Sequence, residues 1–292
     1  MASFLVRSGG DPKAAAAFLE RLNRLPSSHI GYCGEDYGEI LHTIEADFSD
    51  LGFEKSFWVA EEEKVIIGAL GLDISVEDRE AGVWGPFVDP DYPFREVAER
   101  LWKKAVGSVV GKVSRFGFFT NEENFEAAAF ADRLGAVRAG RHIVLQAERK
   151  EGRADRSAVP FEPCHEKAFR ELHEASFPGT YLSSDEILDR LNGHYRLLVI
   201  PDESDGLKGY IYVEADPLHG EGAIEFLAVS TRHRRQGIAT RLLRTGLAEL
   251  FGHEKILSIR LTVEEGNEAA LALYKAAGFR SVHRLTAWTM ER

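Results

Sequence analysis

Apolar residues follow two different spacings along the second half of the chain. Runs rich in β-branched and aromatic residues predict strands, and such runs lie at 195–200, 208–214 and 223–229. A helical spacing follows in 238–251, at Ala239, Leu242, Leu243, Leu247 and Leu250. Further helices are expected at 165–175, 186–191 and 267–277, and further strands at 157–163, 259–263 and 285–290. This order of elements predicts a sheet covered by helices.

The first half of the chain repeats the second. Residues 88–102 align without a gap with 229–243 at an offset of 141, and 124–136 align with 267–279 at an offset of 143. The second offset holds to the end of each half, where Glu148 and Arg149 match Glu291 and Arg292. Two separated blocks with nearly the same offset indicate two copies of one domain.

We therefore predict an α+β protein with two tandem domains, 1–149 and 156–292. Each domain is expected to be a mixed, largely antiparallel sheet flanked by helices. The length of 292 residues fits two domains, and the charged stretch 148–157 fits a linker between them.

Composition and short motifs exclude several classes of protein. Hydrophobic residues make up 44% of the chain and charged residues 28%, as in ordinary soluble globular proteins. Arg7 comes before any long apolar run, so we expect neither a signal peptide nor a membrane anchor. The two cysteines, Cys33 and Cys164, form no CxxC pair, which excludes a disulfide framework and suits a reducing cytoplasm.

Charge and histidine spacing narrow the set of partners. The net charge of −11 argues against a nucleic-acid partner or an anionic membrane surface. The ten histidines show no HExxH spacing, so no metal site is expected. The chain has no GxxxxGK[ST] loop and no GxGxxG turn after a strand, which disfavours nucleotide hydrolysis and dinucleotide binding.

One junction of strand and helix has the chemistry of an anion site. Residues 234–240 read R-R-Q-G-I-A-T and lead into the helical pattern of 238–251. The first N–H groups of a helix lack intrahelical partners, and the helix dipole makes that end positive, so an anion binds there. Gly237 lets the backbone approach an anion without a Cβ in the way, and Arg234 and Arg235 add positive charge. The alternative is an ordinary charged loop before a helix.

A second block, N-E-A-A-L-A-L-Y-K-A-A-G-F at 267–279, follows one strand later. Together the two blocks resemble the GNAT family of acyl-coenzyme A dependent N-acyltransferases. The family signature Q/R-x-x-G-x-G/A is matched by Arg234, Gly237 and Ala239. Its segment N-x-x-A-x-x-x-Y-x-x-x-G-F is matched by Asn267, Ala270, Tyr274, Gly278 and Phe279. The resemblance covers 156–292 almost completely and 1–149 only in outline.

The resemblance implies direct acyl transfer in a splayed sheet, with acetyl-coenzyme A as the acyl donor. The backbone of Leu227, Ala228 and Val229 is expected to pair with the pantetheine arm, and Asn267 is expected to bind the same arm. The pyrophosphate is expected at the turn before the helix. The cofactor-binding residues expected there are Arg234, Arg235, Gln236, Gly237, Ile238, Ala239 and Thr240.

The same resemblance assigns to Tyr274 the protonation of the departing thiolate. On reference pKa values of ~10 for a phenol and ~8.5 for a thiol, full transfer is uphill by roughly 2 kcal/mol, so a positioned phenol can donate. The acceptor amine must lose a proton to a base, and Glu225 is the first candidate, with Glu214 second. Strand alternation puts Glu225 on the same face as Leu227 and Val229.

The first copy serves as an internal comparison. Where the second copy has Arg234 and Gly237, the first has Pro93 and Glu96. A carboxylate repels phosphate, and a proline removes a backbone donor. The other changed positions are Pro86 opposite Leu227, Trp84 opposite Glu225, and Ala131 opposite Tyr274. We therefore expect 1–149 to have kept the fold and lost cofactor binding and catalysis.

These features predict an N-acetyltransferase that moves an acetyl group from acetyl-coenzyme A to a primary amine of a small molecule or peptide. We expect it to act in the cytoplasm as a monomer or homodimer. A non-catalytic acyl-coenzyme A sensor or scaffold is the alternative, which would keep the turn without needing Tyr274 or a base. Four further residues fit either an acceptor pocket or ordinary packing: Tyr181, Tyr210, Tyr212 and His219.

Overall fold

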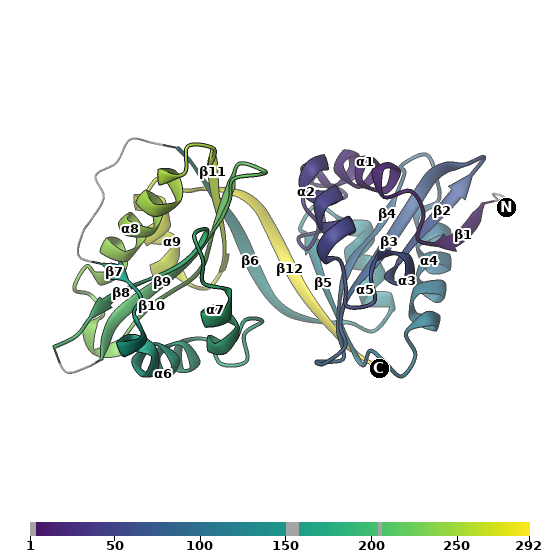
Figure 1. Cartoon of the computed structure of the whole chain (residues 1–292). Helices are drawn as coiled ribbons and strands as arrows, with labels where there is room; N and C mark the ends of the chain where they lie inside the picture. The colour runs from purple at the N-terminus through teal and green to yellow at the C-terminus, as the bar shows by residue number, and fades with distance from the viewer. Residues whose placement is uncertain (1–3, 150–157, 204–205) are drawn as a thin grey trace. The chain divides into compact units, whose positions relative to one another are not determined.

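The computed structural model describes residues 4–149, 158–203 and 206–292, and the chain forms two compact units. Unit 1 comprises residues 1–142 and 283–292, and unit 2 comprises residues 143–282. Each unit is a sheet with helices on both faces (Figure 1). The predicted linker 148–157 lies almost entirely outside the described residues.

The sheet of unit 1 has the strand order β1-β2-β3-β4-β5-β12. Its strands are β1 (Leu5–Ser8), β2 (Phe57–Glu62), β3 (Val65–Ser75), β4 (Glu80–Val88), β5 (Arg115–Asn121) and the unit 1 part of β12 (Arg280–Glu291). The pairs β1–β2, β2–β3, β3–β4 and β5–β12 are antiparallel, and β4–β5 is parallel. The parallel pairing covers Glu80–Gly82 and Arg115–Gly117, after which the two strands separate.

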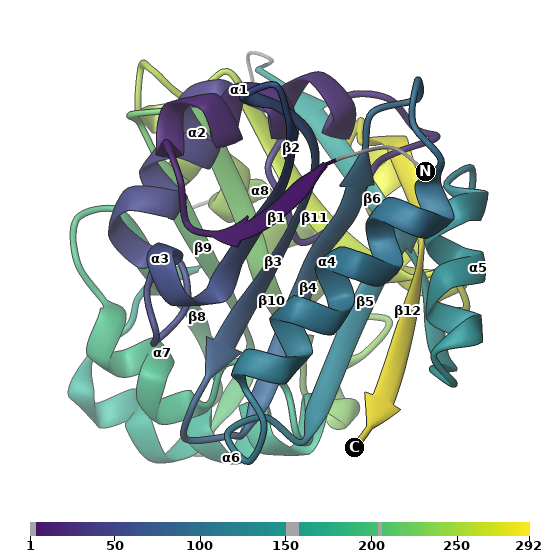
Figure 2. The same cartoon turned by 90° about the vertical axis from the view of Figure 1, so that its right-hand side faces the viewer.

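Two sets of helices cover the faces of this sheet. One face carries α1 (Pro12–Asn23), α2 (Tyr37–His42), the π-helical turn η1 (Thr43–Asp47) and α3 (Phe53–Ser56). The other face carries α4 (Phe94–Ser108) and α5 (Phe125–Arg133), and Figure 2 shows α4 lying across the strands. Asp11 begins α1 by accepting from the Lys13 N–H, because an N-cap carboxylate satisfies a free helix N–H.

The sheet of unit 2 has the strand order β6-β11-β10-β9-β8-β7. Its strands are the unit 2 part of β6 (Val137–Glu148), β7 (Val159–Pro160), β8 (Tyr195–Pro201), β9 (Leu207–Asp216), β10 (Glu221–Val229) and β11 (Ser258–Glu264). The pairs β7–β8, β8–β9 and β9–β10 are antiparallel, and β10–β11 is parallel.

The sheet of unit 2 has a hydrophobic core on each of its faces, and each core is covered by helices. The 3₁₀ turn η2 (Pro163–His165), α6 (Glu166–Ser176) and α7 (Ser184–Arg190) cover one face, and α8 (Ile238–Gly252) and α9 (Glu268–Ala276) cover the other. Ser183 and Glu186 form a capping box that begins α7. A second 3₁₀ turn, η3 (Thr231–His233), lies between β10 and α8.

The later part of the last strand of each repeat belongs to the unit built by the other repeat. Trp288 and Met290 of β12 lie in the core of unit 1. Ile143, Leu145 and Ala147 of β6 lie in the core of unit 2. The compact units therefore follow the two sequence repeats except at these two strands.

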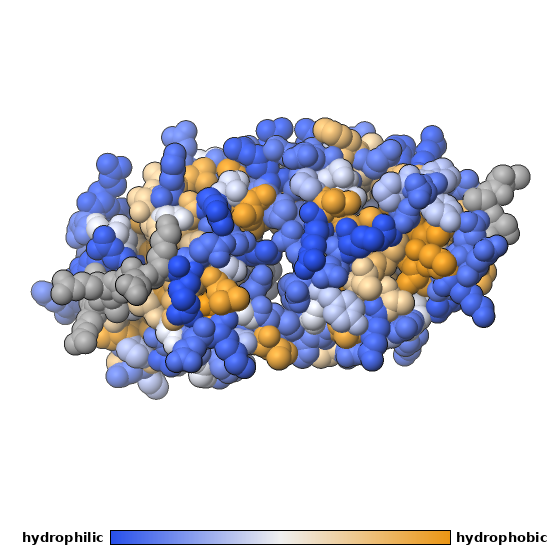
Figure 3. Space-filling view, turned by 90° about the horizontal axis from the view of Figure 1, so that it is seen from above, coloured by the Kyte–Doolittle hydropathy of each residue, from blue (hydrophilic) through white to orange (hydrophobic). Residues whose placement is uncertain are grey.

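The structure confirms the predicted fold class and the predicted order of elements. The helices expected at 165–175, 186–191, 238–251 and 267–277 are α6, α7, α8 and α9, and the strand expected at 157–163 is the short β7. The view in Figure 3 shows a largely hydrophilic surface with small apolar patches. Within the described residues, every helix is too short or too polar to span a bilayer.

Candidate functional site

The sheet of unit 2 opens between β10 and β11. The parallel pairing joins Glu221–Ala223 to Ser258–Arg260, yet β10 runs on to Val229 and β11 to Glu264. Beyond Ala223, β10 pairs with β9 on its other edge, as far as Val229 with Gly209. The backbone of the predicted cofactor strand therefore forms one side of this splay.

The turn between β10 and α8 has the backbone geometry of an anion site. Arg235 and Gly237 both adopt positive φ, at 63° and 77°, which is a conformation that glycine reaches at the lowest cost. Gly237 is the N-cap of α8, and among the described residues no side chain caps this end. Apart from Gly237 and its chain neighbours, no described residue has an atom within 4 Å of a Cβ built at Gly237. The backbone beside Gly237, where the free N–H groups of the first helical turn begin, is thus open to a ligand.

The polar side chains of this turn are exposed and partly tied to the backbone. Arg234 donates from Nε to the Val229 carbonyl at the end of β10 (3.4 Å), and Gln236 donates from Nε2 to the Arg232 carbonyl (3.1 Å). Arg235 and Thr240 are exposed, whereas Ile238 is buried and Ala239 half-buried. Of the predicted cofactor residues in this turn, Ile238 can contribute its backbone N–H while its side chain packs in the core.

A β-bulge lies at Glu225. Ile224 pairs with Val213 and Phe226 pairs with Tyr212, so Glu225 has no residue opposite it on β9. A bulge of this kind changes which side chains share a face. Ile224 accordingly packs in the core under α8 and α9, whereas Phe226 packs in the core under α6 and α7.

Because of the bulge, the side chain of Glu225 lies on the opposite face of the strand from the one predicted. Leu227 and Val229 pack toward α8 and α9, but the Glu225 carboxylate accepts a hydrogen bond from the hydroxyl of Tyr181 in the loop between α6 and α7. The Tyr181 ring stacks on Phe226 with centroids 5.5 Å apart. Strand alternation therefore predicted the wrong face, because it assumes a regular strand.

The Glu225 carboxyl is held in a partly dry, charged environment. Burial raises its pKa above the ordinary value of 4.5, the hydrogen bond from Tyr181 lowers it, the charge of Glu214 raises it, and the charge of Arg190 lowers it. Glu214 itself accepts from the Tyr212 hydroxyl (2.7 Å). A raised pKa makes the carboxylate a stronger base, which favours the uptake of a proton.

The other aromatic candidates take different positions. Tyr210 is fully buried and its hydroxyl binds His173 Nδ1 (2.6 Å). Tyr212 is also buried in the core under α6 and α7. His219 binds Asp216 through Nδ1 (2.6 Å) within the turn that follows β9. Tyr181, which is 68% exposed, is the one of the four whose hydroxyl reaches Glu225.

Tyr274 lies in the same core as Leu227, Val229 and Ile238. It is buried, with its ring 5.6 Å from that of Phe279. Burial raises the pKa of Tyr274 to about 12. The phenol therefore stays protonated at neutral pH and is a weaker acid than an ordinary tyrosine, whose pKa is 10.0.

Asn267 has a structural role in addition to any predicted contact with a cofactor. Its side chain accepts from the Ala270 N–H (3.1 Å) as the N-cap of α9. Asn124 makes the same bond to Ala127 (3.1 Å) as the N-cap of α5. Helix capping thus explains why this residue is shared by the two repeats.

Unit 1 builds its corresponding junction differently. Helix α4 begins at Phe94 with Pro93 as its N-cap, so Glu96 lies in the first helical turn and not at the N-cap. The gapless alignment still holds in the structure: a Cβ at Gly68 would meet Val97 and Leu101, and a Cβ at Gly209 would meet their aligned partners Ile238 and Leu242. Helix α4 therefore begins about one turn earlier than α8 at the aligned positions. An acidic side chain in the first turn complements the helix dipole from within the chain. Trp84 is buried beside Phe48, with ring centroids 5.0 Å apart.

The splay of unit 1 contains a segment of its own chain, His29–Tyr32, which we call the plug. Ile30 bridges to Thr120 of β5, Gly31 donates to the Phe119 carbonyl (2.7 Å), and Asn121 donates to the His29 carbonyl (3.1 Å). Because β12 pairs with the other edge of β5, these bonds lie on the edge that β4 leaves. The plug therefore pairs with β5 where the splay begins.

A pair of glycines makes room for the plug. Gly82 and Gly117 are opposite each other at the last parallel pair. A Cβ at Gly117 would lie 2.9 Å from the Tyr32 hydroxyl, and one at Gly82 would lie 3.7 Å from the Tyr32 ring. The matching pair in unit 2 is Ala223 and Arg260, both of which carry a Cβ at the same position.

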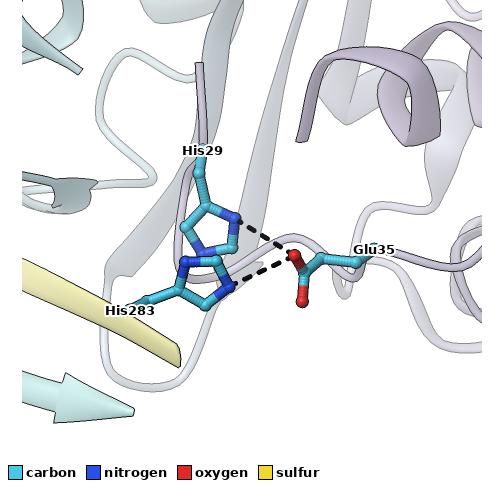
Figure 4. A group of neighbouring side chains, drawn as sticks. All are labelled: His29, Glu35 and His283. Atoms are coloured by element: carbon cyan, nitrogen blue, oxygen red, sulfur yellow. Dashed lines mark hydrogen bonds and ion pairs between the residues drawn. The ribbon is translucent and has the colours of Figure 1, made fainter. Parts of the chain in front are cut away.

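Polar contacts hold the plug on the side of β12 (Figure 4). The rings of His29 and His283 stack with centroids 3.8 Å apart, and His283 Nε2 donates to Glu35 Oε1 (3.2 Å). Asn121 Nδ2 donates to His283 Nδ1 (3.2 Å), while Asn121 Oδ1 accepts from the Glu123 N–H (3.0 Å).

Ligand atoms of His29, Glu35 and His283 lie within 4.8 Å of one another, which is close enough for a metal ion. However, the amide of Asn121 requires an acceptor at His283 Nδ1, so the proton is on Nε2, the atom that faces Glu35. Hydrogen bonds thus account for the arrangement of this cluster.

Comparison with known proteins gives a family and a fold. A model of the acetyltransferase (GNAT) family matches residues 20–136 and 166–279, once in each repeat. The chain is 33% identical over 112 residues to N-acetyltransferase family 8 member 3 of Rattus norvegicus. That match covers 36% of this chain and 44% of the rat protein, so it spans less than half of that relative.

Two solved structures are similar over nearly the whole chain. A GCN5-related N-acetyltransferase from Sphaerobacter thermophilus has a TM-score of 0.78 at 16% identity, covering 99% of this chain and 95% of that one. A tandem GNAT protein from the clavulanic acid biosynthesis pathway has a TM-score of 0.65 at 18% identity, covering 99% and 98%. At such identities the likeness concerns the fold.

Proposed function

The chain belongs to the GNAT acetyltransferase family, and from that premise we propose that its second copy moves an acetyl group from acetyl-coenzyme A to a primary amine of a small molecule or peptide. One observation carries the proposal. The open edge of β10 and the N-terminus of α8, which no described side chain caps, are joined by residues 230–237. A ligand with an extended arm and a phosphate end fits such a pair of features.

The residues of the turn fit the phosphate end of the donor. Backbone N–H groups of Ile238, Ala239 and Thr240 belong to the first turn of α8 and have no acceptor within the helix, and the helix dipole favours an anion there. Arg234 and Arg235 add charge beside them, and Arg234 is tied to the Val229 carbonyl. The backbone of Leu227, Ala228 and Val229 can orient the arm along the splay.

Two side chains are proposed to handle protons. When bound, acetyl-coenzyme A supplies the thioester whose carbonyl carbon the amine attacks. Glu225 takes the proton that the amine must lose, because its raised pKa suits that role. With a pKa of about 12 for Tyr274 and ~8.5 for a thiol, full transfer is uphill by about 5 kcal/mol. Tyr274 therefore acts by donating a hydrogen bond to the sulfur.

The first copy is proposed to bind no acyl donor. Its plug pairs with the edge of β5 at the splay, and the Tyr32 ring lies against Gly82 and Gly117. The buried Trp84 stands where the second copy has its base. Catalysis is thus assigned to the second copy alone.

Thiol release from acetyl-coenzyme A, measured across a panel of small-molecule, polyamine and peptide amines, tests this function. We expect release with at least one class of amine, together with a product that carries an added acetyl group. Tight binding of acetyl-coenzyme A without release for any amine would instead favour a non-catalytic acyl-coenzyme A sensor.

A further inference from the structure

Tyr181 is fixed from two sides in the loop between α6 and α7. Its ring stacks on Phe226, with centroids 5.5 Å apart and planes 27° apart. The next residue, Leu182, is buried, and its carbonyl accepts from His173 Nε2 (2.9 Å). Although 68% of the tyrosine is exposed, the loop that carries it is anchored to the core.

The anchor itself has a defined protonation state. Because His173 Nε2 donates to a carbonyl, His173 Nδ1 must accept, and it accepts from the Tyr210 hydroxyl (2.6 Å). Burial lowers the pKa of His173, which keeps the imidazole neutral. The buried pair therefore anchors the loop to the core.

The Tyr181 hydroxyl donates to Glu225 Oε2. Local burial of the hydroxyl beside Glu225, together with the charges of Glu225 and Glu214, raises the pKa of Tyr181 above the ordinary value of 10.0, so the phenol remains a donor. The bond uses one lone pair of Oε2, so Oε1 lies outside this hydrogen bond and keeps its lone pairs. A carboxylate at a bulge, without a residue opposite on β9, gains its orientation from such a bond.

We propose that Tyr181 is a positioning residue that holds the Glu225 carboxylate ready for the acceptor amine. This inference rests on the proposed function, in which Glu225 is the base. The groups that face Glu225 come from three elements: Tyr181 from the loop, Glu214 and Tyr212 from β9, and Arg190 from α7. Among them, Tyr181 is the group whose hydroxyl bonds directly to the carboxylate.

The hydrogen bond from Tyr181 changes the pKa of Glu225, which a purely structural role of Tyr181 would not do. The hydrogen bond lowers the pKa of Glu225, against the effect of burial. Tyr181→Phe keeps the ring on Phe226 and removes the hydroxyl, so the pKa of Glu225 rises further. Because the base works in its ionised form, the acid limb of kcat/KM against pH then moves to higher pH.

The first measurement needs no substrate. Titration of the Glu225 carboxyl by NMR in protein with ¹³C-labelled glutamate, assigned with Glu225→Gln, gives its pKa directly. We expect a pKa above 4.5 in the natural protein and a higher one in Tyr181→Phe. Tyr92→Phe is the matched control, because Tyr92 donates to Glu62 (2.7 Å) in unit 1, and it should leave the Glu225 titration unchanged.

The second measurement is the pH profile of kcat/KM with an amine that supports thiol release. The acid limb should move up in Tyr181→Phe, stay in place in Tyr92→Phe, and disappear with most of the activity in Glu225→Gln. An unchanged pKa of Glu225 in Tyr181→Phe would overturn the positioning role. A raised pKa without a moved acid limb would leave the hydrogen bond standing and refute Glu225 as the base.

Discussion

Tyr274 is a buried phenol whose environment changes what it can do. A pKa of about 12 makes it a poor acid, but a protonated phenol remains a hydrogen-bond donor. It shares a core with Leu227 and Val229 of the splay strand, so its position and its chemistry are both compatible with a contact to the departing sulfur.

Tyr274→Phe should therefore lower kcat by roughly 10- to 100-fold, since a hydrogen bond to a charged group contributes about 1.5–3 kcal/mol. The affinity for acetyl-coenzyme A should stay close to that of the natural protein, because the phosphate end binds elsewhere. Steady-state kinetics with calorimetric binding of the donor separates the two effects. An unchanged kcat would remove Tyr274 from the mechanism.

At the scale of single residues, the sequence predicted some features of the site and missed others. The turn at Arg234–Thr240 was predictable, because a glycine and two arginines before a helical pattern carry their own physical reason. The face of Glu225 was not, because I-E-F-L-A-V reads as regular alternation with or without a bulge. Tyr181 was named as a candidate, but its partner depends on how the loop folds back onto β10.

At the scale of elements, the two repeats differ in the residues that lie where their parallel strands separate. In unit 1 a parallel Gly82–Gly117 pair admits Tyr32 and the plug, whereas in unit 2 the same pair is Ala223–Arg260. The plug is tied down by Asn23, whose side chain binds Ile30, Cys33 and Gly34. Sequence comparison predicted that the first copy lost its chemistry, but the plug is a tertiary contact without a local pattern.

Gly117→Ala tests the plug by filling the space that Tyr32 uses. The new Cβ would lie 2.9 Å from the Tyr32 hydroxyl, so we expect a loss of about 1 kcal/mol, measured as a lower thermal midpoint. The same change in a Tyr32→Phe background should cost less, because the nearest atom is gone. Gly82→Ala, with a Cβ in ordinary contact at 3.7 Å, is the matched control. Equal losses in both backgrounds would contradict this packing.

At the scale of the whole molecule, the boundaries of the two sequence repeats differ from the boundaries of the two compact units. The second repeat supplies Trp288 to the core of unit 1, and the first supplies Leu145 to the core of unit 2. The sequence could not predict this exchange. The two last strands end in the same Glu-Arg pair, so the sequence pattern does not indicate which sheet each strand joins.

The number of acetyl-coenzyme A molecules bound per chain tests the central claim most directly. Isothermal titration calorimetry should give one site in the natural protein and none in Gly237→Glu, where a carboxylate would face the phosphate. Gly111→Glu is the matched control, because Gly111 has nearly the same φ (78° against 77°) and equally open space at its Cβ. It should therefore keep the site. Two sites per chain, or undiminished binding in Gly237→Glu, would contradict the assignment of the donor to the second copy.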